Sequence, residues 1–131
     1  MRVVAGALID ADGRVLIAER PAGKHLAGRW EFPGGKLGSE ESAEQALARE
    51  LREELGIEIA HCEWLLDLAI DHGDRQLTLH CYVVEAFSGE PRSLEGQALL
   101  WVKADELSQH DILEADQPFI AALQRWLKRA R

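Results

Sequence analysis

Residues 35–57 read GKLGSEESAEQALARELREELGI, and this stretch decides the fold because it holds the most regular helical pattern in the chain. Ser42 is a favourable N-cap, and Gln45 three residues later completes a capping box. Gly56 supplies the left-handed residue that often ends a helix. Apolar residues recur with the helical period at Ala43, Ala46, Leu47, Leu51 and Leu55. The pattern therefore predicts a helix from residue 43 to residue 55.

Three carboxylates crowd one side of this predicted helix. Glu50, Glu53 and Glu54 fall within an arc of roughly 100°, beside the apolar stripe, since each residue turns the helix by about 100°. Like charges at this spacing repel each other. A hard divalent cation such as Mg²⁺ would relieve the repulsion, because it prefers oxygen ligands and bridges carboxylates to substrate phosphates. The alternative is a solvated helix face, salt-bridged locally by Arg49 and Arg52.

Composition limits the classes of function. A chain of 131 residues, 47% hydrophobic and 29% charged, is typical of one globular domain with a core of its own. The formal net charge of -8 opposes binding to a nucleic acid polymer, which requires a basic face, but it leaves room for a small phosphorylated ligand. Two cysteines do not make a disulfide framework. We find no signal-peptide pattern and no apolar run of about 18 residues, so we expect a cytoplasmic protein that does not enter membranes.

The rest of the chain alternates predicted strands with a second helix. A strand from Val3 to Ile9 and another from Arg14 to Arg20 are expected to pair as a hairpin around the turn residues between them. Further extended segments are predicted at residues 30–32, 64–71, 76–87 and 99–102, with a hairpin turn at 71–74 and a last helix beginning near Pro118. This order predicts a single α/β domain, an α/β sandwich with a central mixed sheet.

The residues of the helical stretch also fill a known pattern. Gly35, Glu41, Arg49-Glu50-Leu51, Glu53-Glu54 and Gly56-Ile57 occupy every fixed position of a motif that resembles the Nudix box. The resemblance implies one Nudix domain over residues 1–131, with the box at 35–57 as a loop-helix-loop in an α/β/α sandwich. It also implies hydrolysis of nucleoside diphosphates linked to another group, dependent on Mg²⁺, with Mn²⁺ as a possible substitute.

The resemblance assigns roles within the box. The Gly34 carbonyl and the carboxylates of Glu50, Glu53 and Glu54 would bind the metal, with Glu50 also helping to activate water. Arg49 would orient the glutamates. Hydrolysis of a pyrophosphate link requires charge neutralisation on the phosphate oxygens and a positioned water, which metals held by carboxylates supply. Because the proton affinities of clustered carboxylates depend on one another, the sequence alone does not identify the general base.

Segments outside the box are similar to the MutT-type branch, which removes pyrophosphate from nucleoside triphosphates, notably 8-oxo-dGTP, and so prevents DNA damage. These segments are residues 4–7, 16–20, 30–35, 74–75, 95–97 and 115–118. The similarity implies a further metal-binding carboxylate at Glu95 and nucleotide contacts at Arg20, Phe32 and Arg75. His25, in the loop before the box, is a further candidate contact. Each residue also has an ordinary interpretation: a surface strand end, a core ring or a solvated loop.

Asp116 departs from the pattern of the branch. Enzymes that select oxidised guanine are expected to have Asn here, which both donates and accepts, whereas an ionised Asp only accepts. A protonated Asp would donate, provided that burial raised its pKa. Residues 97–101 and 115–116 also resemble enzymes that act on cytidine and modified pyrimidine triphosphates, which is the alternative substrate class. A non-catalytic nucleotide-binding module is a second alternative. We expect a nucleoside triphosphate as the partner, and a monomer or homodimer.

Overall fold

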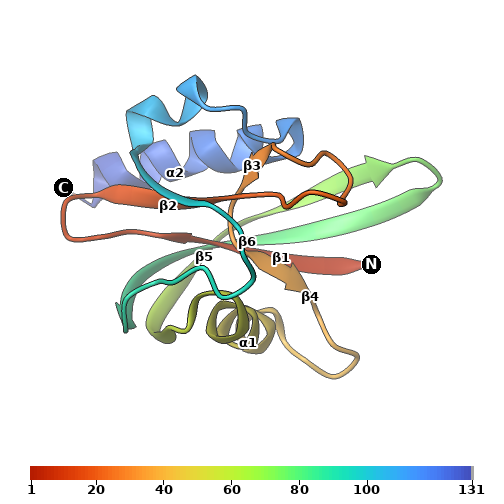
Figure 1. Cartoon of the computed structure of the whole chain (residues 1–131), viewed down its shortest axis with the longest axis horizontal. Helices are drawn as coiled ribbons and strands as arrows, with labels where there is room; N and C mark the ends of the chain where they lie inside the picture. The colour runs from red at the N-terminus through yellow and green to blue at the C-terminus, as the bar shows by residue number, and fades with distance from the viewer. Residues whose placement is uncertain (131) are drawn as a thin grey trace.

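Two β-sheets lie between two helices in the computed structural model, which describes residues 1–130 apart from the side chain of residue 72 (Figure 1). Helix α1 covers one outer side and α2 the other, so the layers form an α/β/α sandwich, as predicted (Figure 1). The strands are β1 (Arg2–Leu8), β2 (Arg14–Glu19), β3 (Trp30–Glu31), β4 (Gly34–Lys36), β5 (Glu58–His72), β6 (Arg75–Ser88) and β7 (Leu99–Lys103). The helices are α1 (Ala43–Leu55), the 3-10 turns η1 (Ala104–Gln109) and η2 (Glu114–Asp116), and α2 (Gln117–Arg129).

The larger sheet is mixed. Its strand order is β4-β1-β6-β5, with β1 parallel to β6 and antiparallel to β4. The smaller sheet, in the order β3-β2-β7, is antiparallel. The prediction that segments 3–9 and 14–20 pair as a hairpin is wrong, because β1 and β2 belong to different sheets. An isolated bridge between Ile9 and Val15 joins their ends. β1 is buried on both faces and uses both of its edges for β4 and β6, so β2 enters the other layer.

The predicted helix is present with both of its caps. The Ser42 hydroxyl accepts from the Gln45 amide at 3.1 Å, and the Gln45 side chain accepts from the Ser42 amide at 2.9 Å. Gly56 closes the helix at φ 72° and donates to the Arg52 carbonyl. The five predicted apolar residues are all buried, and they pack with Val4 and Leu8 of β1. The box helix is therefore fixed against the most buried strand of the mixed sheet.

A second core lies between the sheets and α2. Ala5 and Ala7 of β1 face this core, and Phe119, Ile120 and Leu123 of α2 complete it. Alternate residues of β1 thus enter both cores, as the twofold period of a strand requires. β1 is the buried centre of the fold, and the strand that carries the Gly34-Gly35 pair is hydrogen-bonded to it.

Several element bounds differ from the sequence prediction. The sequence did not predict β4, because glycine is depleted in strands. β5 begins at Glu58, whereas the prediction began at residue 64. The hairpin turn between β5 and β6 is confirmed, with Gly73 at φ 68°. Cys62 and Cys81 are free thiols, one half-buried and one buried. Within the described residues, no helix is long and apolar enough to span a membrane.

Candidate active site

Two glycines bring the box strand and the box helix together. Gly34 pairs with Ala5 across the β4–β1 ladder, and a Cβ on Gly34 would overlap the Val4 carbonyl. A Cβ on Gly35 would lie 2.7 Å from Oε2 of Glu50, closer than atoms can pack. Only glycine therefore fits at position 34, and any side chain at position 35 would displace the Glu50 carboxylate. The missing side chain at Gly35 forms a cradle in which the Glu50 carboxylate lies against the backbone of β4.

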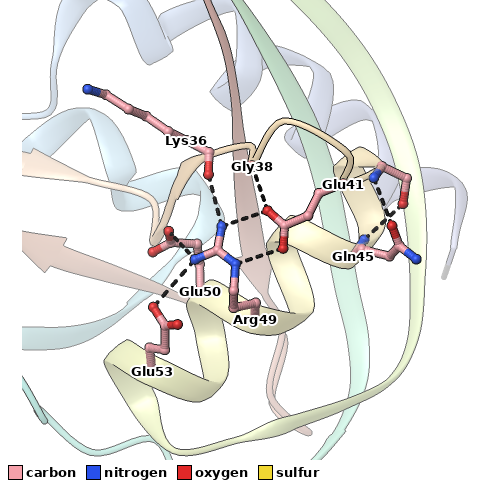
Figure 2. Close-up of polar contacts among 8 residues, drawn as sticks. Lys36, Gly38, Glu41, Gln45, Arg49, Glu50 and Glu53 are labelled. Atoms are coloured by element: carbon pink, nitrogen blue, oxygen red, sulfur yellow. Dashed lines mark hydrogen bonds and ion pairs between the residues drawn. The ribbon is translucent and has the colours of Figure 1, made fainter.

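Arg49 is the centre of a polar network that joins the loop before α1 to the glutamates of α1 (Figure 2). Its Nε and Nη2 donate to the two carboxylate oxygens of Glu41 at 2.7 and 2.8 Å. Nη2 also donates to the Lys36 carbonyl at 3.0 Å, while Nη1 donates to Glu50 at 2.9 Å and to Glu53 at 3.4 Å. The guanidinium thus joins the loop before the helix to two of the three crowded glutamates.

Glu41 anchors the other end of this network. Its Oε1 accepts from the Gly38 amide at 2.7 Å, while both oxygens accept from Arg49 (Figure 2). These hydrogen bonds, that of Arg49 first, lower the pKa of Glu41 to about 2. The same contacts raise the pKa of Arg49 above its usual value. Glu41 is therefore ionised at neutral pH and holds the loop onto the helix.

We expect Arg49→Lys to lower the free energy of unfolding by about 1 kcal/mol, since an ammonium cannot reproduce the two-pronged contact with Glu41 and the pair is partly exposed to solvent. Arg52→Lys on the same helix is the matched control. Arg52 contacts Glu58 at 2.6 and 2.9 Å, but both side chains are more than half exposed. Urea unfolding of the two variants would compare them, and equal midpoints would contradict the bracing role of Arg49.

Glu54 faces the interior, unlike Glu53. Its Oε2 is buried and has no hydrogen-bond partner among the described residues. Burial, a hydrogen bond with Glu50 and the nearby charges of Glu50, Glu95 and Glu31 raise the pKa of Glu54 to about 9. Two carboxyl groups share a hydrogen bond only when a proton lies between them. A buried oxygen without a partner is costly, and a cation would satisfy it in place of that proton.

The donor atoms at this end of the helix are of the kind that bind a hard cation, but the described carboxylates are not gathered around a common point. Glu50, Glu54 and Glu95 supply carboxylate oxygens, the type that Mg²⁺ prefers. Within the described part of the chain, no three His, Cys, Asp or Glu side chains are gathered at metal-binding spacing. Glu50 and Glu53 instead form ion pairs with the Arg49 guanidinium. The Gly35 cradle and the unpartnered Glu54 oxygen are the two features at this end of the helix that a bound cation would fit.

A small pocket of about 40 Å³ opens beside Glu54. It is lined by Ala18, Glu19, Pro21, Lys24, Glu31, Pro33, Glu54, Glu95 and Gln97. Gln97 is 8% exposed, and its side-chain oxygen accepts from the Glu95 amide at 3.0 Å. The loop backbone also donates to the end of α1, from Leu94 to the Glu54 carbonyl at 3.1 Å. These contacts place Glu95 next to the box, although it is far away in sequence.

Arg20 and Asp116 lie near each other, together with a residue that sequence reasoning missed. Arg20 Nη1 donates to Glu31 at 2.7 Å, and its Nε donates to the His25 carbonyl at 2.7 Å. Asp116 is 6% exposed. Burial and then the charge of Glu31 raise the pKa of Asp116 to about 7, partly offset by Arg20. Only the position of Glu31 in the Trp-Glu-Phe-Pro segment could have identified it from the sequence. A single Glu beside an aromatic residue is also typical of an ordinary strand, so the residue was not selected.

Two other candidate contacts lie elsewhere. Phe32 is 4% exposed and packs in the second core, with its ring centroid 4.4 Å from that of Phe119. Phe32 is therefore a core ring in this structure, in agreement with its ordinary interpretation. Arg75 is exposed at the end of the β5–β6 hairpin, which extends beyond the paired length of β1 (Figure 1). The structure does not bring Arg75 to the pocket.

Comparison with known proteins agrees with this geometry. The family model described as NUDIX domain matches residues 4–122. The chain is 42% identical to a CTP pyrophosphohydrolase of Escherichia coli K12, over 98% of this chain and 94% of the relative. It is 46% identical to a putative 8-oxo-dGTP diphosphatase 2 of Mycobacterium tuberculosis H37Rv, over 95% of this chain and 89% of the relative. The solution structure of the E. coli ORF135 protein superposes with a TM-score of 0.86 at 42% identity, covering 99% of this chain and 91% of that one. This protein belongs to the Nudix family.

Proposed function

We propose that this protein hydrolyses nucleoside triphosphates between the α and β phosphates, releasing a nucleoside monophosphate and pyrophosphate. The observation that carries the proposal is the buried, unpartnered Oε2 of Glu54 beside the Glu50 carboxylate, on the helix of a complete Nudix box. A divalent cation would satisfy that oxygen and would in turn attract phosphates. The relatives named as a CTP pyrophosphohydrolase and an 8-oxo-dGTP diphosphatase support the same reaction class.

The residues of the box would have separate roles in binding the cation and in activating water. Glu50, Glu53, Glu54, Glu95 and the Gly34 carbonyl would hold Mg²⁺, or Mn²⁺ in its place. When bound, the cation supplies charge neutralisation on the phosphate oxygens. Arg49 holds Glu50 and Glu53 in orientation through its Nη1 contacts. A carboxylate oxygen of Glu50, seated against Gly35, takes the proton of the attacking water.

The first candidate substrate is 8-oxo-dGTP, whose removal keeps the damaged base out of DNA. The burial of Asp116 supports it, because a pKa raised to about 7 leaves part of the population protonated at neutral pH. A protonated carboxyl both donates and accepts, as the Asn expected in this branch would do. Glu31, which accepts from Arg20, extends the same polar group to the lining of the pocket.

The second candidate is CTP or a modified pyrimidine triphosphate. Its support is the identity with the CTP pyrophosphohydrolase, together with the carboxylates of Asp116 and Glu31. Ionised carboxylates accept only. They therefore suit a base edge that presents N–H groups, such as the amino group of cytosine. The two candidates differ in the protonation state of Asp116 that they require.

A substrate panel decides between them. It contains 8-oxo-dGTP, dGTP, CTP, a 5-substituted dCTP, a nucleotide sugar and a dinucleoside polyphosphate, each with Mg²⁺, and the products are separated by chromatography. We expect monophosphate and pyrophosphate from the triphosphates, with kcat/KM ranking 8-oxo-dGTP first. A ranking led by CTP would select the alternative. Preference for the nucleotide sugar, or release of single phosphate, would refute the proposal, and binding without any product would indicate a non-catalytic module.

We further propose that the enzyme acts in the cytoplasm as a monomer or homodimer on free nucleotides. The net charge of -8 opposes a stable contact with DNA or RNA. Titration of labelled duplex and single-stranded DNA at low salt would check this, because a basic docking face would give salt-dependent binding.

A further inference from the structure

Lys24 is the one cationic residue among the described residues that line the small pocket beside Glu54. Four of its neighbours in the lining are carboxylates, namely Glu19, Glu31, Glu54 and Glu95. A cation bound at the box offsets only part of this negative charge. A triphosphate adds more, so a positive group in the lining matters for binding.

The loop that carries Lys24 is tied down at several points. Its ends are joined by hydrogen bonds from the Arg20 amide to the Arg29 carbonyl at 2.8 Å and from the Gly28 amide to the Arg20 carbonyl at 3.0 Å. Within the loop, the Lys24 carbonyl accepts from the Ala27 amide at 3.1 Å. The Arg20 guanidinium adds a contact to the His25 carbonyl. The backbone of Lys24 is therefore held at the pocket, and its long side chain is exposed to solvent there.

Arg20 serves this loop rather than the pocket itself. Its Nη1 is engaged by Glu31 and its Nε by the His25 carbonyl, and Arg20 does not line the pocket. The pocket volume of about 40 Å³ accommodates little more than one water-sized group. A whole nucleotide is too large for this pocket, so most of it would have to lie outside.

We propose that the ammonium of Lys24 binds the β or γ phosphate of the substrate, on the side of the triphosphate opposite the box glutamates. This inference rests on the proposed function. An ammonium on a flexible stem suits the task, because it acts as a point charge and follows the phosphate as the substrate settles. Lys24 is thus a binding residue for the pyrophosphate half of the substrate, and it does not read the base.

The test compares Lys24→Met with Lys128→Met, which removes the same charge from the far end of α2. With Mg²⁺ and the best triphosphate of the panel, we expect Lys24→Met to raise KM about tenfold and to change kcat less than threefold. Lys24→Arg should stay within threefold of the parent protein in KM. Lys128→Met should match the parent protein in both constants.

Product inhibition locates the contact on the substrate. Lys24→Met should weaken inhibition by pyrophosphate about tenfold and leave inhibition by the monophosphate unchanged, with calorimetry of Mg²⁺-pyrophosphate as a readout independent of turnover. Unchanged pyrophosphate binding would overturn the inference, as would an equal loss for the monophosphate. A parent protein that turns over no triphosphate would refute the proposed function instead, while calorimetry would still test Lys24.

Discussion

Glu54→Gln is expected to reduce Mg²⁺-dependent pyrophosphate release by at least about 100-fold without unfolding the protein. Loss of groups that merely support a metal ligand already costs about 10- to 100-fold, and Glu54 holds the buried oxygen that lacks a partner. The amide has the same size and no charge, so it removes the cation ligand while leaving the packing intact. Activity would be followed by chromatography, and thermal unfolding would be recorded with and without Mg²⁺.

The stabilising shift produced by Mg²⁺ should disappear in the same variant. A ligand that binds only the folded state raises apparent stability, so loss of the shift reports loss of binding. Glu44→Gln is the matched control, because Glu44 is an exposed acid in the first turn of the same helix. Near-parental turnover and an unchanged Mg²⁺ shift in Glu54→Gln would exclude Glu54 as a cation ligand.

Asp116→Asn is expected to stabilise the protein above pH 7 by up to about 4 kcal/mol and to change little near pH 4. Burial raises the pKa of Asp116 from 3.8 to about 7. The folded state thus keeps a proton that the unfolded chain loses, and stability falls as pH rises from about 4 to 7. Each unit of pKa difference corresponds to about 1.36 kcal/mol. Asn has no proton to lose, so the variant escapes this decline.

Urea unfolding of Asp116→Asn and of the parent protein between pH 4 and pH 8 would measure the difference in their free energies of unfolding. The other carboxylates titrate in both proteins, so their contribution cancels in this difference. Asp105→Asn, at an exposed position in η1, should show no such dependence. A difference between Asp116→Asn and the parent protein that is independent of pH would show that Asp116 keeps an ordinary pKa. Running the substrate panel on the same variant would then show how the donor at this position affects the choice of base.

Local patterns predicted the box helix well because its determinants lie within the helix. Ser42, Gln45 and Gly56 act on their own neighbours, and the apolar stripe states which face is buried. The same cannot be said of segments 3–9 and 14–20. Both were recognised as strands, but their partners are far away in sequence, and turn residues between two strands do not distinguish a hairpin from a crossing between layers.

The sequence by itself determined the box: its helix, its caps, its crowded glutamates and the reaction class that they imply. Only the tertiary structure decided which glutamate faces inward, because a carboxylate becomes costly to ionise only when other elements bury it and bring like charges near, as Glu31 and Glu95 do for Glu54. It also placed Phe32 in the core, gathered Arg20, Glu31 and Asp116, and brought Lys24 to the pocket. These relations join residues far apart in the chain, so no local pattern records them.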